Sequence, residues 1–82
     1  MSEYEAIFDL EISEMEKLVR AFDHVTGKMV ARGEQDIELL QAMHDEEGLI
    51  KERIKVGMVK HMRELFADCY RRATGAEAWD EQ

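Results

Sequence analysis

At 82 residues the chain can form one small domain, and such a domain buries only about 60 to 65% of the surface that its unfolded chain exposes. Its formal net charge of −8 argues against direct binding to nucleic acid, because phosphate contacts need clustered Lys and Arg. A membrane span is excluded, because 37% of the residues are charged and no apolar run approaches the roughly 18 residues that a spanning helix needs.

The cysteine content and the N-terminal pattern bear on the compartment. Cys69 is the single cysteine, so the chain cannot form an internal disulfide framework. The first residues are acidic and interrupted, unlike a signal peptide. We therefore expect a reducing, cytoplasmic compartment.

The stretch at residues 8–13 is ambiguous between strand and helix. Phe8, Leu10 and Ile12 alternate with polar residues as in a half-buried strand. The chain offers no second run rich in Val, Ile, Thr or aromatic residues that could pair with such a strand, and it contains no proline. We interpret the stretch as helix, because its apolar residues continue a helical stripe of Phe8, Ile12, Met15, Leu18, Val19, Phe22, Val25 and Met29.

Two capping patterns, Ser2-x-x-Glu5 and Ser13-x-x-Glu16, could begin this first helix. Its expected end is Arg32-Gly33, where a cation in the last turn precedes a glycine able to adopt the left-handed cap. Leu10 falls off the apolar stripe and Glu11 falls on it. We expect these two misfits to mark a second neighbour of the helix near its N-terminus.

A second segment is expected from an N-cap at Asp36 to the glycine at Gly75. Three acids precede Gly48, and acids are unfavourable at a helix C-terminus but favourable at an N-terminus. We therefore expect one long helix, straight or kinked near 45–48, with two separate helices as the alternative. Its main stripe consists of Ile37, Leu40, Met43, Ile50, Ile54, Met58, Met62, Leu65, Cys69 and Ala73.

Charge alternates in blocks along the chain. Residues 1–16 and 34–47 each hold six acids and no bases, whereas 17–33 carry a net +3 and 48–72 a net +4. With a turn near 33–36, an antiparallel hairpin would place residue i roughly level with residue 69 − i and match these signs. The predicted fold is an all-α antiparallel helical hairpin at 1–75, followed by an acidic tail at 76–82.

The second helix carries more apolar surface than one neighbour can cover. We therefore expect a second copy to complete a four-helix bundle. Trp79 in the tail is either disordered or an anchor for a partner. The expected partner or dimer interface comprises Phe8, Leu10, Glu11, Val56, Val59, Phe66 and Tyr70.

No catalytic motif, phosphate loop, Cys-x-x-Cys pair or zinc signature occurs, so we expect neither an enzyme nor a cofactor. The Glu-x-x-His pattern of di-metal bundles is absent, and the reverse pattern occurs at His44-x-x-Glu47 and His61-x-x-Glu64. Cys69 and most methionines are expected in the core, His24 in solvent, and Glu47 paired with Lys51. Candidate metal ligands, were a metal to be found, are Glu11, His44, Glu47 and His61.

The leading functional hypothesis is a non-enzymatic regulatory or adaptor protein that acts through helix faces as a homodimer. A second hypothesis is an acidic inhibitor, of the type that phages encode, covering the basic nucleic-acid-binding surface of another protein. A third is a metal- or cofactor-binding bundle that assembles only on dimerisation.

Overall fold

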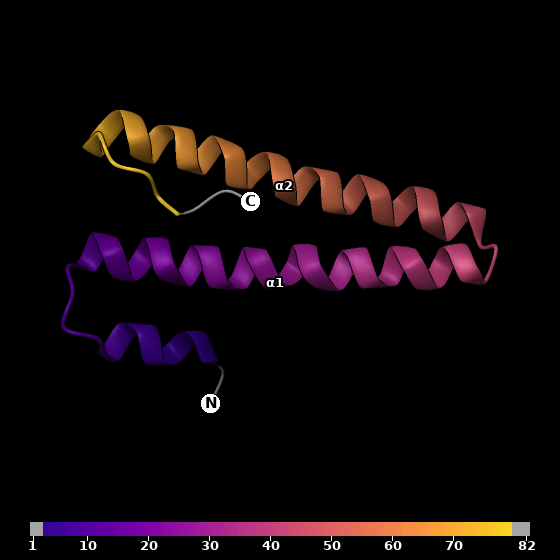
Figure 1. Ribbon diagram of the computed structural model, residues 1–82, viewed down its shortest axis with the longest axis horizontal. Helices are drawn as coiled ribbons and strands as arrows, with labels where there is room; N and C mark the ends of the chain where they lie inside the picture. Colours follow the sequence, from indigo (N-terminus) through magenta and orange to yellow (C-terminus); the bar gives the residue numbers. More distant parts are fainter. Residues whose placement is uncertain (1–2, 80–82) are drawn as a thin grey trace.

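The computed structural model describes residues 3–79, and the secondary structure of this part of the chain is entirely helical, without strands. A short 3₁₀ helix, η1 (Glu3–Asp9), precedes two α-helices of equal length, α1 (Glu14–Ala42) and α2 (Glu46–Thr74). The two long helices form an antiparallel hairpin (Figure 1). The predicted all-α helical hairpin is therefore confirmed.

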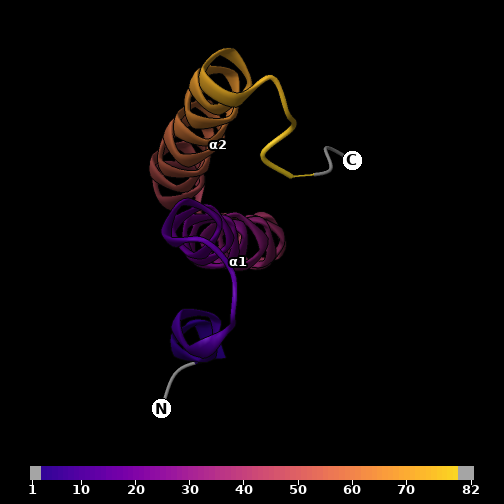
Figure 2. The ribbon, with the colours of Figure 1, turned by 90° about the vertical axis from the view of Figure 1, so that its left-hand side faces the viewer.

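The three helices lie side by side in a single layer. Figures 1 and 2 show η1 along the first part of α1, on the side opposite α2. The principal extents are 47 × 32 × 17 Å, so the molecule is flat. Among the described residues only Val19, Ala21 and Val56 are buried apolar side chains. A stable domain usually needs two packed layers around a core, and this hairpin supplies one.

The ambiguous stretch at 8–13 is neither a strand nor part of the first long helix. η1 ends at Asp9 and a bend follows, with the Leu10 N–H donating to the Ile7 carbonyl at 3.2 Å. Ser13 is the N-cap of α1, and its hydroxyl accepts from the Glu16 N–H at 3.1 Å. The prediction of one continuous helix through this stretch is wrong because a cap in extended backbone geometry interrupts it. Ser2 lies outside the described residues.

The hairpin turn lies at residues 43–45, about ten residues beyond the predicted 33–36. Asp45 is the N-cap of α2, its carboxylate accepting from the Gly48 N–H at 3.0 Å, and Glu46 and Glu47 occupy the first turn. His44 adopts a left-handed conformation with φ of 57°. The break that the acids at 45–47 suggested is thus the turn itself, and the predicted turn at 33–36 is wrong.

Gly33 is a contact point between the helices and does not end α1. It is buried, and a Cβ built on it would overlap Cγ2 of Val56. The glycine therefore permits close approach of α1 and α2, and no cap forms there. At the other end of α2 the prediction is confirmed: Gly75 has φ of 75° and donates to the Arg71 carbonyl at 2.7 Å.

The position of the turn changes the register. Phe22 stacks on Phe66, so residue i lies roughly level with residue 88 − i and not with 69 − i. Ion pairs still join the helices, between Asp23 and Arg63 at 2.7 Å and between Glu34 and Lys60 at 3.0 Å. In this register the basic block 17–33 lies level with residues 55–71, which also carry a net positive charge, so matching the charge blocks had favoured the wrong register.

Candidate interaction surface

The open end of the hairpin is closed by an aromatic stack. The rings of Phe22 and Phe66 are nearly parallel, with centroids 4.4 Å apart. Trp79 stacks on the same pair, 5.7 Å from Phe66 and 6.1 Å from Phe22. Trp79 is thus an intrachain anchor, a role that neither reading of the tail had included. Residues 80–82 of the predicted flexible tail lie outside the described part of the chain.

Arg63 ties this stack to α1. Its guanidinium donates to the Asp23 carboxylate at 2.7 Å, to the Asp23 carbonyl at 3.0 Å and to the Thr26 hydroxyl at 2.6 Å. Its Cζ lies 4.7 Å from the centroid of the Trp79 ring, in cation–π geometry. The Arg63 side chain is 19% exposed, so these contacts are partly shielded from water. Sequence patterns had not singled out this cluster, because its members come from three separate segments.

A row of apolar side chains along α2 is left uncovered, and we call it the α2 stripe: Ile50, Ile54, Met58, Met62 and Leu65. Each of the five is between 53% and 63% exposed. At 100° per residue they centre roughly 140° around the helix from the side chains that face α1. The stripe therefore points away from the hairpin contact, and a further neighbour is needed to cover it.

A second set of exposed apolar side chains lies on α1 and near η1. Leu18, Val25 and Met29 on α1 are 55%, 38% and 45% exposed. Phe8 and Leu10 are 47% and 42% exposed. Soluble monomers seldom expose large contiguous apolar areas unless these serve contacts. Apolar surface is thus left open on both long helices.

The predicted interface residues divide into two groups in the structure. Val56 and Phe66 are committed to contacts with α1, while Val59 and Tyr70 are half-buried. Phe8, Leu10 and Glu11 are exposed, so a partner contact there stays a prediction. The residues expected inside the hairpin, including Met58, Met62 and Cys69, are exposed instead. The face of the second helix that was predicted to lie inside the hairpin is therefore exposed, and the face with Val56 and Phe66, predicted to contact a partner, packs on α1.

The candidate metal ligands are not brought together. His44 lies in the turn, His61 is exposed on α2, and Glu11 lies in the bend after η1. Glu47 is exposed and pairs with Lys51 at 3.3 Å, as predicted. The described residues contain no group of three or more side chains placed to hold a metal ion. His24, expected in solvent, is half-buried.

The hollows in the surface are shallow. One of about 190 Å³, at the open end of the hairpin, is bordered by Glu16, Arg20 and Tyr70, and another of about 200 Å³ lies beside the turn near His44 and Leu49. Both are open to solvent. Because neither hollow is enclosed, the exposed apolar rows are the candidate binding surface.

Comparison with known proteins adds no family. No family model, no curated protein and no solved structure matches the chain. Within the described residues, neither long helix combines the length and apolar character that crossing a membrane requires. The candidate site is therefore defined by the geometry of the chain alone, as an exposed apolar surface along α2.

Proposed function

We propose that this chain is a small, non-enzymatic regulatory or adaptor protein that acts through helix-mediated protein contacts as a homodimer. The observation that carries the proposal is the α2 stripe, whose five side chains are each more than half exposed. Two flat hairpins that cover each other's stripes form a four-helix assembly with a shared core.

The energetics of a single hairpin favour association. Full burial of a large apolar side chain contributes about 1.5 to 3 kcal/mol, so covering one that is already half-buried contributes about 1 kcal/mol. Ten such side chains from two copies contribute free energy of the same order as the association cost of about 4 to 15 kcal/mol. With the lower association cost the net gain is about 6 kcal/mol, so we expect a weak dimer with a dissociation constant of some tens of micromolar.

A role as an acidic inhibitor of a basic surface is the second candidate. The base-free block at 34–47 forms the last part of α1, the turn and the start of α2, which concentrates acids at one end of the hairpin. A basic partner bound there would dissociate as salt is raised. Pull-downs that recover no basic protein, or an affinity independent of salt, would refute this role.

The metal-binding bundle has no observation in its favour, because Glu11, His44 and His61 lie far apart along the chain and on different elements. Metal analysis of protein purified without a histidine tag tests it directly. One bound metal ion per chain or per dimer would support the metal-binding bundle.

Sedimentation equilibrium of the full chain between about 1 and 200 μM tests the proposed homodimer. We expect a concentration-dependent dimer that Ile54→Glu on the α2 stripe dissociates. Leu39→Glu is the matched control, because Leu39 is 59% exposed, close to the 60% of Ile54, but lies on α1. A folded monomer at every concentration would refute the proposal.

A further inference from the structure

We propose that the occupant of the α2 stripe is the α2 helix of a second copy, packed antiparallel so that residue i lies level with residue 117 − i of that copy. This inference rests on the proposed homodimer and specifies its geometry. The two-fold axis then passes close to Met58, and each α1 lies on the outer side of its own α2.

The spacing of the α2 stripe suits this arrangement. Its residues follow one another at intervals of four, four, four and three, an average slightly above the 3.6 of a straight helix, so the row drifts around α2 and two such helices pack with a right-handed twist. In the proposed register Met58 meets its own copy near the axis. Ile54 falls between Met62 and Leu65 of the second copy, so side chains interdigitate along the contact.

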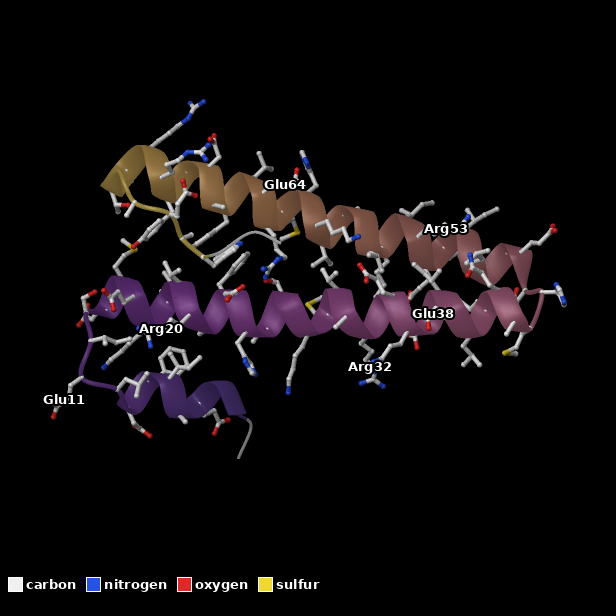
Figure 3. The ribbon with its side chains drawn as sticks, viewed as in Figure 1. Glu11, Arg20, Arg32, Glu38, Arg53 and Glu64 are labelled. Carbon is white, nitrogen blue, oxygen red and sulfur yellow. The ribbon has the colours of Figure 1, made fainter. Side chains whose placement is uncertain are left out.

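Charged residues along one side of the α2 stripe, which we call its flank, supply charge complementarity between the two copies of α2. Arg53, Glu64 and Glu46 lie on the same side of α2, are exposed, and make no ion pair within the described part of the chain. Figure 3 shows Arg53 and Glu64 on α2 outside the gap between the two long helices. In an antiparallel pair each flank faces the same flank of its partner, so basic and acidic residues on one flank can pair across the axis.

The proposed register brings opposite charges together twice on each side of the axis. Arg53 lies level with Glu64 of the second copy, and Glu46 lies level with Arg71. Arg71 already pairs with Asp68 at 2.7 Å within its own chain, so it would bridge two carboxylates. The four symmetric contacts select a register more than they add affinity.

Neighbouring registers bring like charges together. A shift of seven residues in one direction places Glu46 level with Glu64 of the second copy. The same shift in the other direction places Arg53 level with Arg71. Repulsion between like charges disfavours both of these shifts relative to the register 117 − i.

Charge reversal tests the register. Arg53→Glu and Glu64→Arg each turn two attractive contacts per dimer into repulsive ones, so we expect each to raise the dissociation constant about tenfold or more. The double variant R53E/E64R restores opposite charges at the same sites and should return the dissociation constant to within about threefold of wild type.

Two exposed residues on α1 supply matched controls. Arg32→Glu and Glu38→Arg change the net charge by the same amounts, and both side chains lie on α1 away from the α2 stripe (Figure 3). We expect neither control to change the dissociation constant by more than about twofold, the small effect of an exposed surface charge. Sedimentation of all five variants, with circular dichroism to confirm folding, gives the comparison.

The single cysteine provides an independent distance. Cys69 is exposed, so it accepts a spin label without a further substitution. In the proposed register the two copies of residue 69 are separated by 21 residues along α2, about 30 Å at 1.5 Å per residue. A parallel pairing would place the labels about 10 Å apart, the spacing of adjacent helix axes.

The outcomes separate the inference from the proposed function. Weakening by both single reversals, recovery in the double variant and a label distance near 30 Å support the register. A dimer that ignores the reversals, or a short label distance, refutes the register and leaves the homodimer standing. A wild-type monomer at every concentration refutes both.

Discussion

The close approach of α1 and α2 at Gly33 allows us to predict how much Gly33→Ala lowers the free energy of unfolding. A Cβ at this position would overlap Cγ2 of Val56, which is 4% exposed and cannot move into solvent without losing its packing. Forcing one extra methyl group into a packed contact costs about 1 to 3 kcal/mol. Alanine in a helix interior recovers about 0.5 to 1 kcal/mol relative to glycine. The net expectation is a loss of about 1 to 2 kcal/mol.

Gly57→Ala is the matched control. Gly57 also lies inside a long helix, but a Cβ there would meet no atom within 4 Å. Only the propensity gain remains, so this variant should be more stable by about 0.5 to 1 kcal/mol. The two glycine substitutions should therefore shift the melting temperature in opposite directions, with Gly33→Ala lowering it by about 5 to 15 °C.

Val56→Ala completes a double-mutant cycle. Removing both γ-methyl groups of Val56 makes room for the new Cβ at position 33, so Gly33→Ala should cost much less in the V56A background. Urea unfolding followed by circular dichroism, at one low protein concentration so that association does not contribute, measures all the variants. Equal losses for Gly33→Ala and Gly57→Ala, or no coupling between positions 33 and 56, would show that the helices do not meet at this point.

Other substitutions test the caps and the cluster at the open end. Arg63→Met removes the charged hydrogen bonds to Asp23 and should cost about 1 to 2 kcal/mol, discounted for the partial exposure of the carboxylate, whereas Arg63→Lys should recover part of the loss in the same unfolding assay. Trp79→Ala should speed proteolysis of the tail, and the emission of wild-type Trp79 should shift to the red on unfolding; an unchanged digestion rate would contradict docking of the tail. Asp45→Ala removes the N-cap of α2 and should cost about 1 kcal/mol in urea unfolding, with Asp45→Asn close to neutral. His44→Gly should stabilise the hairpin by several tenths of a kcal/mol to about 1 kcal/mol, because glycine adopts the left-handed conformation without strain; a loss of stability would contradict that conformation.

The helical hairpin could be predicted from periodicity, but the place where it turns could not. Gly33 after Arg32 has the local signature of a helix end, and only its contact with Val56 shows that the missing side chain serves packing. The true turn contains no glycine or proline at residues 43–45, and His44 takes the left-handed conformation instead. The local signal at Gly33 was therefore misleading, because packing against Val56 explains that glycine, whereas at the true turn the acids that begin α2 were the only local signal.

The presence of an exposed apolar surface on the second helix could be predicted from the sequence, but the residues that form it could not. The second helix was expected to carry more apolar surface than one neighbour covers, and its exposed stripe agrees with that. Helical spacing predicts that the stripe through Met58 lies in the core, together with Cys69 and most of the methionines. In the structure Val56 and Phe66 face α1 instead, since the close contact at Gly33 and the stack on Phe22 fix the rotation of α2.

The antiparallel layout also implies an order of folding. Contacts next to the turn, such as that between Leu40 and Gly48, join residues close in sequence, whereas Arg63 reaches back 40 residues to Asp23. Once one contact between α1 and α2 has formed, the next contact further from the turn closes only a small additional loop. A chain that forms these contacts in order from residues 43–45 outward therefore avoids a large entropy cost of loop closure. The open end then forms last and frays first. The stack of Phe22, Phe66 and Trp79 lies near this end, so its contacts must break before the hairpin can open from there.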